Sequence, residues 1–125
     1  MVILITGRAD SGKSTHAKRL AEELRSAGQQ VQVLDGDIHR AMMGNDDFSN
    51  LGRYKNLKAM AETAQMIEAN GRTAIVACVA PKREWRDMMR GMWIESRLVY
   101  LPGGALWPDT EYEVPNIEEF NVYRD

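Results

Sequence analysis

Short apolar runs alternate with longer amphipathic stretches along the chain. The apolar runs predict four buried strands, at residues 2–6, 31–34, 73–79 and 97–101. Apolar positions that recur every three or four residues predict helices between them. These helices cover residues 12–27, about 40–43, 51–70 and 83–92, and Gly28, Gly44 and Gly71 end the first three. A late edge strand is predicted at residues 120–123.

Strands that alternate with helices are typical of a parallel sheet covered by helices. We therefore expect an α/β fold, a three-layer sandwich with a short, mostly parallel sheet, as a single domain over residues 1–125. The pattern is lost after Pro102-Gly103-Gly104, so residues 102–125 should form an irregular tail that completes the site and adds the edge strand. Ligands of such sheets bind at the carboxyl ends of the strands.

The turn after the first strand carries a phosphate-binding motif. Residues 7–14, Gly-Arg-Ala-Asp-Ser-Gly-Lys-Ser, fit G-x-x-x-x-G-K-[ST]. Its glycines let backbone N–H groups wrap phosphate oxygens at a helix N-terminus. We expect a P-loop NTPase or kinase in which Lys13 reaches the β- and γ-phosphates and Ser14 binds Mg²⁺. The remaining predicted contacts to the nucleotide are Gly7, Asp10, Ser11, Gly12 and Thr15.

Two carboxylates follow the second strand, in Asp35-Gly36-Asp37. Beside a triphosphate, one carboxylate can hold magnesium and one can accept the proton of an attacking hydroxyl. We expect Asp35 to act in metal binding and catalysis, Asp37 in catalysis and acceptor binding, and Lys13 as the third catalytic residue. The alternative for Asp37 is that it only caps the following helix.

Composition indicates a small protein that stays in solution. The chain has 125 residues, 44% of them hydrophobic, and a net charge of −2, so no global field favours nucleic acid. No apolar run could span a membrane, and a cytoplasmic location is expected. Cys78, in an apolar run, should be a core thiol. On the helix at 83–92, Arg83 could reach a phosphate, and Arg86 and Arg90 are expected on a solvated face.

Several segments together resemble the adenylylsulfate kinase family, P-loop kinases that phosphorylate the 3′-hydroxyl of adenosine 5′-phosphosulfate with ATP. The matching segments are, in order, Gly7 to Thr15, Leu34-Asp35-Gly36-Asp37 with Arg40, Phe48-Ser49 with Arg53 and Asn56 (F-S-x-x-x-R-x-x-N), Ala80-Pro81, and residues 109–115 (D-x-x-Y-E-x-P). The resemblance implies ATP and Mg²⁺ as cofactors. It also implies that Phe48 stacks on the adenine of the acceptor, that Arg40, Arg53 and Asn56 bind its anionic end, and that Pro81 lines the acceptor site.

The sequence also departs from this family. The family has a lid between the fourth strand and the tail, with an arginine against the adenine of ATP, where this chain has only Pro102-Gly103-Gly104. The family's second stacking phenylalanine falls at Ala105, and Trp107 is the nearest aromatic residue. Asp10 stands where a small neutral residue is usual. A second copy of the chain could complete the site in a homo-oligomer.

Two alternative functions remain open from the sequence. One is a kinase for a hydroxyl of a modified nucleotide or of nucleic acid, because an acceptor site without a lid would admit a larger substrate. The other is a nucleotide-binding protein without catalysis, against which the presence of Lys13, Ser14 and the two aspartates argues.

Overall fold

The computed structural model describes residues 1–42, 44, 49–104 and 111–119. Its elements are β1 (Val2–Gly7), α1 (Lys13–Ser26), β2 (Val31–Asp35), α2 (Gly36–Met42), α3 (Asn50–Ala69), β3 (Thr73–Cys78), α4 (Arg83–Gly91), β4 (Ser96–Leu101) and a 3₁₀ helix at Ile117–Glu119. Every strand and helix predicted within the described residues is present. The short helix begins earlier than predicted, directly after β2, and the predicted edge strand at 120–123 lies outside the described residues.

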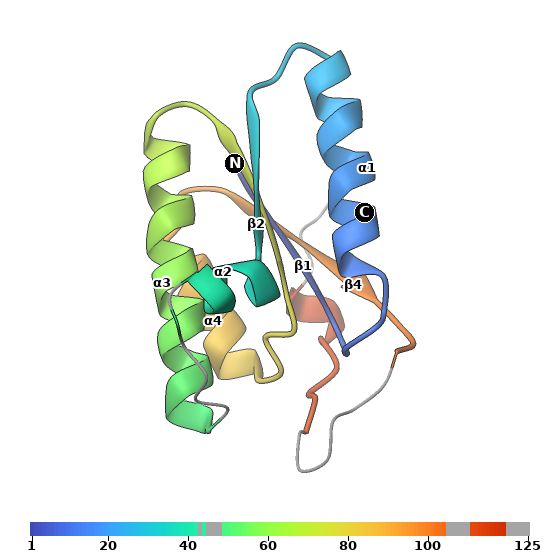
Figure 1. Ribbon diagram of the computed structural model, residues 1–125, viewed down its shortest axis with the longest axis vertical. Helices are drawn as coiled ribbons and strands as arrows, with labels where there is room; N and C mark the ends of the chain where they lie inside the picture. The colour runs from blue at the N-terminus through green and yellow to red at the C-terminus, as the bar shows by residue number, and fades with distance from the viewer. Residues whose placement is uncertain (43, 45–48, 105–110, 120–125) are drawn as a thin grey trace.

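The sheet has four strands in the order β2-β3-β1-β4, and each pair of neighbours is parallel. Val2 at the start of β1 pairs with Ala74 of β3 on one side and Ser96 of β4 on the other. Helix α1 covers one face of the sheet, and α3 and α4 cover the other (Figure 1). The predicted three-layer α/β sandwich is confirmed. The carboxyl ends of all four strands therefore lie along one edge.

Alternate residues of β1 supply two hydrophobic cores. Val2 and Leu4 pack with α3 and α4, whereas Ile3 and Ile5 pack with Ala17 and Ala21 of α1. This alternation follows from the period of two along a strand, and continuous burial of β1 and β3 is typical of a parallel sheet covered on both faces. No described helix combines the length and the apolar character that crossing a membrane requires.

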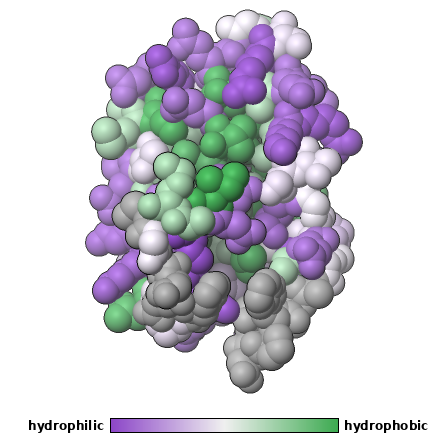
Figure 2. All heavy atoms as spheres, viewed as in Figure 1, coloured by the Kyte–Doolittle hydropathy of each residue, from purple (hydrophilic) through white to green (hydrophobic). Residues whose placement is uncertain are grey.

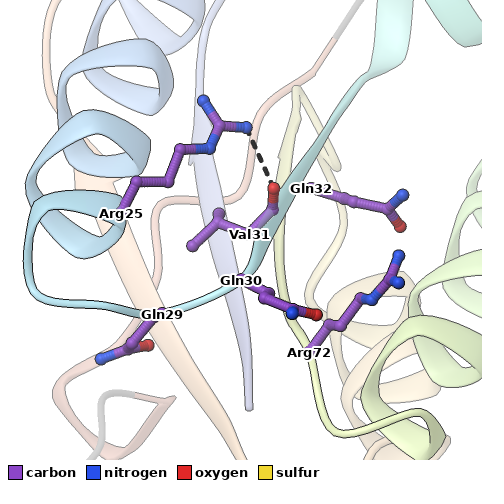
Figure 3. Close-up of a pocket in the computed structure, with 6 residues that line it drawn as sticks. All are labelled: Arg25, Gln29, Gln30, Val31, Gln32 and Arg72. Carbon is purple, nitrogen blue, oxygen red and sulfur yellow. Dashed lines mark hydrogen bonds between the residues drawn. The ribbon is translucent and has the colours of Figure 1, made fainter.

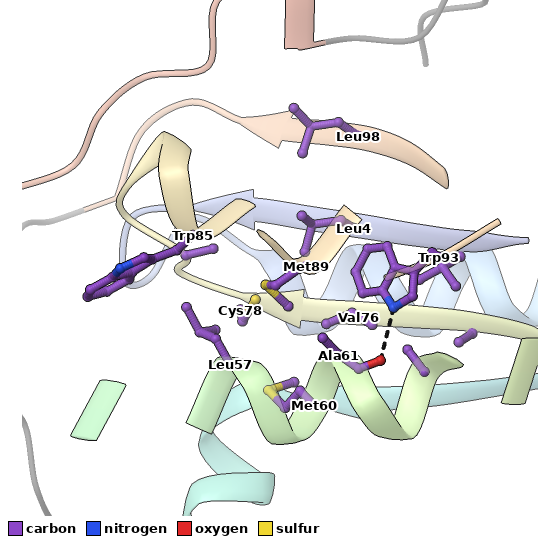
Figure 4. Packing of buried hydrophobic residues seen from close by; sticks show 14 of the residues in the cluster. Leu4, Leu57, Met60, Ala61, Val76, Cys78, Trp85, Met89, Trp93 and Leu98 are labelled. Carbon is purple, nitrogen blue, oxygen red and sulfur yellow. Dashed lines mark hydrogen bonds between the residues drawn. The ribbon is translucent and has the colours of Figure 1, made fainter. Parts of the chain in front are cut away.

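The core beneath α3 and α4 contains apolar side chains of both helices and of the sheet, among them Leu57, Met60, Trp85 and Met89 (Figure 4). Trp93 donates its indole N–H to the carbonyl of Ala61 at 3.0 Å, so its one polar atom is satisfied. Cys78 lies in this cluster, and burial raises the pKa of its thiol to about 12. The interpretation of Cys78 as a core thiol is confirmed, because a thiol with that pKa stays protonated.

The prediction that Arg86 lies on a solvated face is wrong. Arg86 is completely buried and forms a two-pronged ion pair with Glu119, with Nε–Oε1 and Nη2–Oε2 distances of 2.8 and 3.2 Å. Its Nη1 also donates to the carbonyl of Ala80 at 2.8 Å. Glu119 lies in the tail, 33 residues after Arg86, so the spacing of residues within α4 could not predict this partner. Burial raises the pKa of Glu119, but hydrogen bonds from Arg86 and from the N–H of Asn116 outweigh it and leave the pKa below its usual value.

We expect Arg86→Leu to lower the free energy of unfolding by roughly 3–5 kcal/mol, because it leaves the Glu119 carboxylate buried without its partner. Arg86→Leu combined with Glu119→Leu should recover much of that loss. Chemical denaturation of the three proteins measures both effects. A single variant as stable as the parent chain would contradict this reading of the pair.

The same ion pair should make stability sensitive to acid. The lowered pKa of Glu119 means that its contribution is present above the pKa of an unfolded glutamate, about 4.3, and is lost as the pH falls through the lower folded value. Glu119→Gln should therefore lose less stability than the parent chain below about pH 4. Denaturation curves at several pH values would check this.

Candidate active site

The phosphate loop joins β1 to α1 at the carboxyl edge of the sheet (Figure 1). Asp10 and Gly12 take left-handed backbone conformations, with φ of 61° and 94°. Nζ of Lys13 donates to the carbonyl of Arg8 at 2.8 Å, so the lysine is folded over its own loop. The hydroxyl of Ser11 is buried and has no hydrogen-bond partner among the described residues. The loop thus holds polar groups that a bound anion can engage.

Lys13 is half-buried, and burial lowers the pKa of its ammonium group. The thiol of Cys78 and the carboxylates of Asp37, Asp35 and Asp10 oppose that shift. These groups therefore lie close enough to Lys13 to act on its charge. The lysine and both predicted catalytic aspartates therefore share one electrostatic environment.

Asp35 at the end of β2 forms hydrogen bonds to the first turns of both α1 and α2. Its Oδ2 accepts a hydrogen bond from the hydroxyl of Ser14 at 2.5 Å. Its Oδ1 accepts from the backbone N–H groups of Asp37 and Ile38, at 2.9 and 3.3 Å. Asp35, rather than Asp37, thus caps α2. This double use fixes the orientation of the Asp35 carboxylate beside the phosphate loop.

Ser14 and Asp35 fit the magnesium ion that a P-loop implies. Both present oxygen atoms, the donors that Mg²⁺ prefers, and it is usually bound by one or two protein ligands together with substrate phosphates. The described residues contain no cluster of three or more His, Cys, Asp or Glu that could hold a metal without a nucleotide. When bound, the ion neutralises charge that develops on the phosphate oxygens.

The predicted acceptor residues that the structure describes lie on α2, α3 and the turn after β3. His39 on α2 and Asn56 on α3 form a hydrogen bond, with 2.8 Å between Nδ1 and Oδ1. Arg40 and Arg53 lie one residue after His39 and three residues before Asn56, on the same two helices. Pro81 is buried, and its carbonyl accepts from the N–H of Glu113 at 2.7 Å. Phe48 and Trp107 lie outside the described residues.

Sequence reasoning missed the role of Tyr112 beneath the phosphate loop. The Tyr112 hydroxyl lies 2.8 Å from Oγ1 of Thr6 on β1. Its ring stacks on Tyr100, with 6.1 Å between ring centroids, and the guanidinium of Arg8 lies 5.3 Å from its centroid. Burial raises the pKa of Tyr112 to about 12. Its place in the D-x-x-Y-E-x-P motif was the only signal in the sequence.

The segment after β4 lies directly against the phosphate loop. Gly104 has φ of 76°, and a Cβ at this position would come within 2.3 Å of the Ala9 carbonyl oxygen. No side chain fits there, so the approach of the two backbones requires glycine. The segment after β4 therefore packs on the phosphate loop through Gly104 as well as connecting β4 to the tail.

A shallow pocket of about 350 Å³ lies elsewhere, between the end of α1 and the start of β2 (Figure 3). Its lining residues are Arg25, Gln29, Gln30, Val31, Gln32 and Arg72. One of its two arginines already donates to a backbone carbonyl, because Arg25 bonds Val31 at 3.0 Å. The pocket is at the amino end of β2, whereas the phosphate loop is at the carboxyl edge, so it is not part of this site.

A parallel sheet with this loop, an aspartate on the neighbouring strand end and a serine at the head of α1 defines the class of P-loop phosphate-binding proteins. The family model for adenylylsulphate kinase matches residues 1–102. The chain belongs to the adenylylsulphate kinase family, which is a family of P-loop kinases.

Individual relatives agree with this assignment. A probable adenylyl-sulfate kinase from Archaeoglobus fulgidus is 39% identical over 90 residues, which cover 71% of this chain and 58% of the relative. One from Aeropyrum pernix is 35% identical over 102 residues, covering 81% and 56%. The chain thus spans about half the length of the curated relatives that it matches.

Solved structures show the same similarity. The APS kinase CysC from Mycobacterium tuberculosis, in complex with AMPPNP and APS, superposes with a TM-score of 0.76 at 28% identity, covering 80% of this chain and 61% of that one. A hexameric APS kinase from Thiobacillus denitrificans gives a TM-score of 0.73 at 29% identity, covering 94% of this chain and 26% of that one.

We expect Asp10→Gly to bind the magnesium complex of ATP about tenfold more tightly than the parent chain. Glycine adopts the left-handed conformation without strain, and the change removes a negative charge from the loop that binds the triphosphate. Asp10→Asn is the matched control, because it removes the charge and keeps a side chain at the same φ. Titration calorimetry would separate the two causes. Unchanged affinity in both variants would mean that the Asp10 carboxylate points away from the nucleotide.

Proposed function

We propose that this chain is an ATP-dependent phosphotransferase that transfers the γ-phosphate to a hydroxyl of adenosine 5′-phosphosulfate. The observation that carries the proposal is the contact between Asp35 and Ser14 beside Lys13, in a member of this family. A phosphate loop alone needs no carboxylate fixed at its mouth. A carboxylate held in one orientation there can hold Mg²⁺ or take the proton of an attacking hydroxyl, and phosphate transfer to a hydroxyl uses both roles.

In the proposed reaction, Lys13 leaves the Arg8 carbonyl and, with the loop N–H groups, holds the β- and γ-phosphates. Ser14 and Asp35 would hold Mg²⁺. Asp35 orients the acceptor hydroxyl and takes its proton, and Asp37 shares that role or positions the acceptor. The hydroxyl oxygen bonds to the γ-phosphorus as the bond from phosphorus to the β,γ-bridging oxygen breaks. ADP leaves with that electron pair, and the products are ADP and the 3′-phosphorylated acceptor.

Charge and chemistry at the acceptor side support a small anionic nucleotide. Arg40 and Arg53 supply positive charge from α2 and α3 and would bind its phosphosulfate end, next to Asn56 and Pro81. Phe48 and Trp107 would stack on its base, since aromatic rings bind the faces of all bases. The solved complex of the Mycobacterium tuberculosis enzyme holds an ATP analogue and APS together, which supports these two substrates for this chain.

We also propose an oligomeric assembly and a cellular location for the protein. The hexameric relative from Thiobacillus denitrificans supports a homo-oligomer for this chain too. In such an assembly a neighbouring subunit would cover the donor base in place of the family's lid. Both proposed substrates are small nucleotides, and we propose that the protein works in the cytoplasm.

The proposal is tested by labelled-phosphate transfer from ATP to adenosine 5′-phosphosulfate. We expect Asp35→Asn, which can still cap α2, to lower turnover at least roughly a hundredfold because it cannot take the proton. Lys13→Ala should abolish transfer. Asp37→Asn is the matched control for a neighbouring carboxylate, and its turnover shows whether Asp37 shares the role of base.

Several outcomes of this assay would count against the proposal. Transfer to a single-stranded oligonucleotide but not to adenosine 5′-phosphosulfate would replace the acceptor with nucleic acid. Triphosphate binding without transfer to any acceptor would leave a nucleotide-binding protein. Full activity in Lys13→Ala would remove the phosphate loop from the mechanism.

Recognition of the donor base should be loose. Gly104 packs against the phosphate loop, and Pro102-Gly103-Gly104 joins β4 to the tail in too few residues to form the family's lid with its adenine-facing arginine. A lost base contact costs on the order of 1 kcal/mol, so ATP, GTP and deoxy-ATP should serve as donors within about tenfold of one another. The comparison needs several protein concentrations, because a partner subunit could restore base contacts. A strong preference for ATP in the monomer would show that this chain builds its own adenine pocket.

A further inference from the structure

The side chain of Asn56 turns its polar atoms toward the protein. Asn56 is only 6% exposed. Its Oδ1 lies 2.8 Å from Nδ1 of His39, and its Nδ2 lies 3.8 Å from the sulfur of Met60. A thioether sulfur only accepts, so this assignment of the amide is the one that satisfies both ends. The amide oxygen likewise only accepts, and Nδ1 of His39 therefore carries the hydrogen.

This hydrogen bond determines the chemistry of the other ring nitrogen. In a neutral imidazole with its hydrogen on Nδ1, Nε2 has a free lone pair and acts as an acceptor. The His39 side chain is half-buried, and its Nε2 has no hydrogen-bond partner within residues 1–42, 44, 49–104 and 111–119. Among the described residues, this acceptor atom on α2 is thus left without a partner.

His39 lies beside the carboxylate that we assign to the reaction. Asp35 caps α2 and His39 follows four residues later, so both are on the same side of the helix, about 6 Å apart along its axis. Ile38 and Met42 are exposed apolar side chains of α2, at 61% and 81% exposure. Figure 2 shows hydrophobic residues gathered over α2 on the viewed face.

We propose that Nε2 of His39 accepts a hydrogen bond from the second ribose hydroxyl of the acceptor, the one next to the hydroxyl that Asp35 orients. Asn56 is then a positioning residue, which acts on the acceptor through His39. This inference rests on the proposed function, because it takes a ribonucleotide as the acceptor. It makes His39 the group that distinguishes ribose from 2′-deoxyribose.

The kinetic test compares adenosine 5′-phosphosulfate with its 2′-deoxy analogue. The parent chain should prefer the ribose acceptor about tenfold in kcat/KM, the value of one neutral hydrogen bond. His39→Val should lose this preference. His39→Gln should keep part of it, because its amide oxygen can reach the position of Nε2. The KM for ATP should stay unchanged in each variant.

His39→Asn is the decisive variant. Its amide NH₂ can replace Nδ1–H and keep the bond to Asn56, but it has no atom at the position of Nε2. It should therefore fold like the parent chain and lose the preference for ribose. A His39→Asn protein that keeps the full preference would show that residue 39 only supports Asn56, and the inference would be overturned.

A second measurement makes the result independent of turnover. The chain has two histidines, His16 and His39, so their ring nitrogens can be assigned by NMR. We expect the hydrogen of His39 to lie on Nδ1 in the parent chain. In Asn56→Ala this tautomer should no longer be favoured. Adding adenosine 5′-phosphosulfate should shift the Nε2 signal, and adding the 2′-deoxy analogue should not.

Failure of the inference and failure of the proposed function give different results. If the parent chain transfers phosphate but the His39 variants discriminate as it does, only the inference is wrong. If the parent chain transfers no phosphate, the proposed kinase activity is wrong, and the NMR titration still decides the inference. Equal Nε2 shifts with both acceptors, or none with either, would overturn it.

Discussion

The parallel pairing of β1 with β3 and β4 is the constraint on which the rest of this molecule depends. Pairing in the same direction brings the carboxyl ends of the strands to one edge, so the phosphate loop after β1 and Asp35 at the end of β2 meet. It also requires a crossover between successive strands, which places α1 on one face and α3 and α4 on the other. The hydrophobic burial that holds the sheet together thus also assembles the polar site at its edge.

Within that edge, the polar groups serve structure and chemistry together. One oxygen of Asp35 caps α2 and the other receives the hydroxyl of Ser14. Asn56 fixes the ring of His39 in the same way that Asp35 fixes the start of α2. Ser14, Asp35 and His39 are each held by a hydrogen bond to a second group, so these side chains have little conformational freedom left to lose on binding.

The tail extends this arrangement to the far side of the phosphate loop. Arg86 and Glu119 form a buried ion pair that fastens the 3₁₀ helix to α4. Tyr112, seven residues earlier, contacts Thr6 beneath the loop and Arg8 within it. An ion pair of this kind adds little stability over an apolar pair, but it admits only one placement of the tail. That placement brings Tyr112 to the loop.

The sequence by itself determined the fold class, the order of the elements and the identity of the phosphate loop. Those features depend on local patterns: an apolar run for each strand, a helical period for each helix, and a motif of eight adjacent residues.

Tertiary structure alone decided which side chains become partners across large separations in the chain. The period of α4 predicted a solvated Arg86, because the buried carboxylate that pairs with it comes 33 residues later. The motif that contains Asn56 predicted a contact with substrate, but only the packing of α2 against α3 turns its oxygen to His39, 17 residues away. Such pairs depend on how the helices and the tail are placed in space, and no short-range pattern in the sequence encodes that placement.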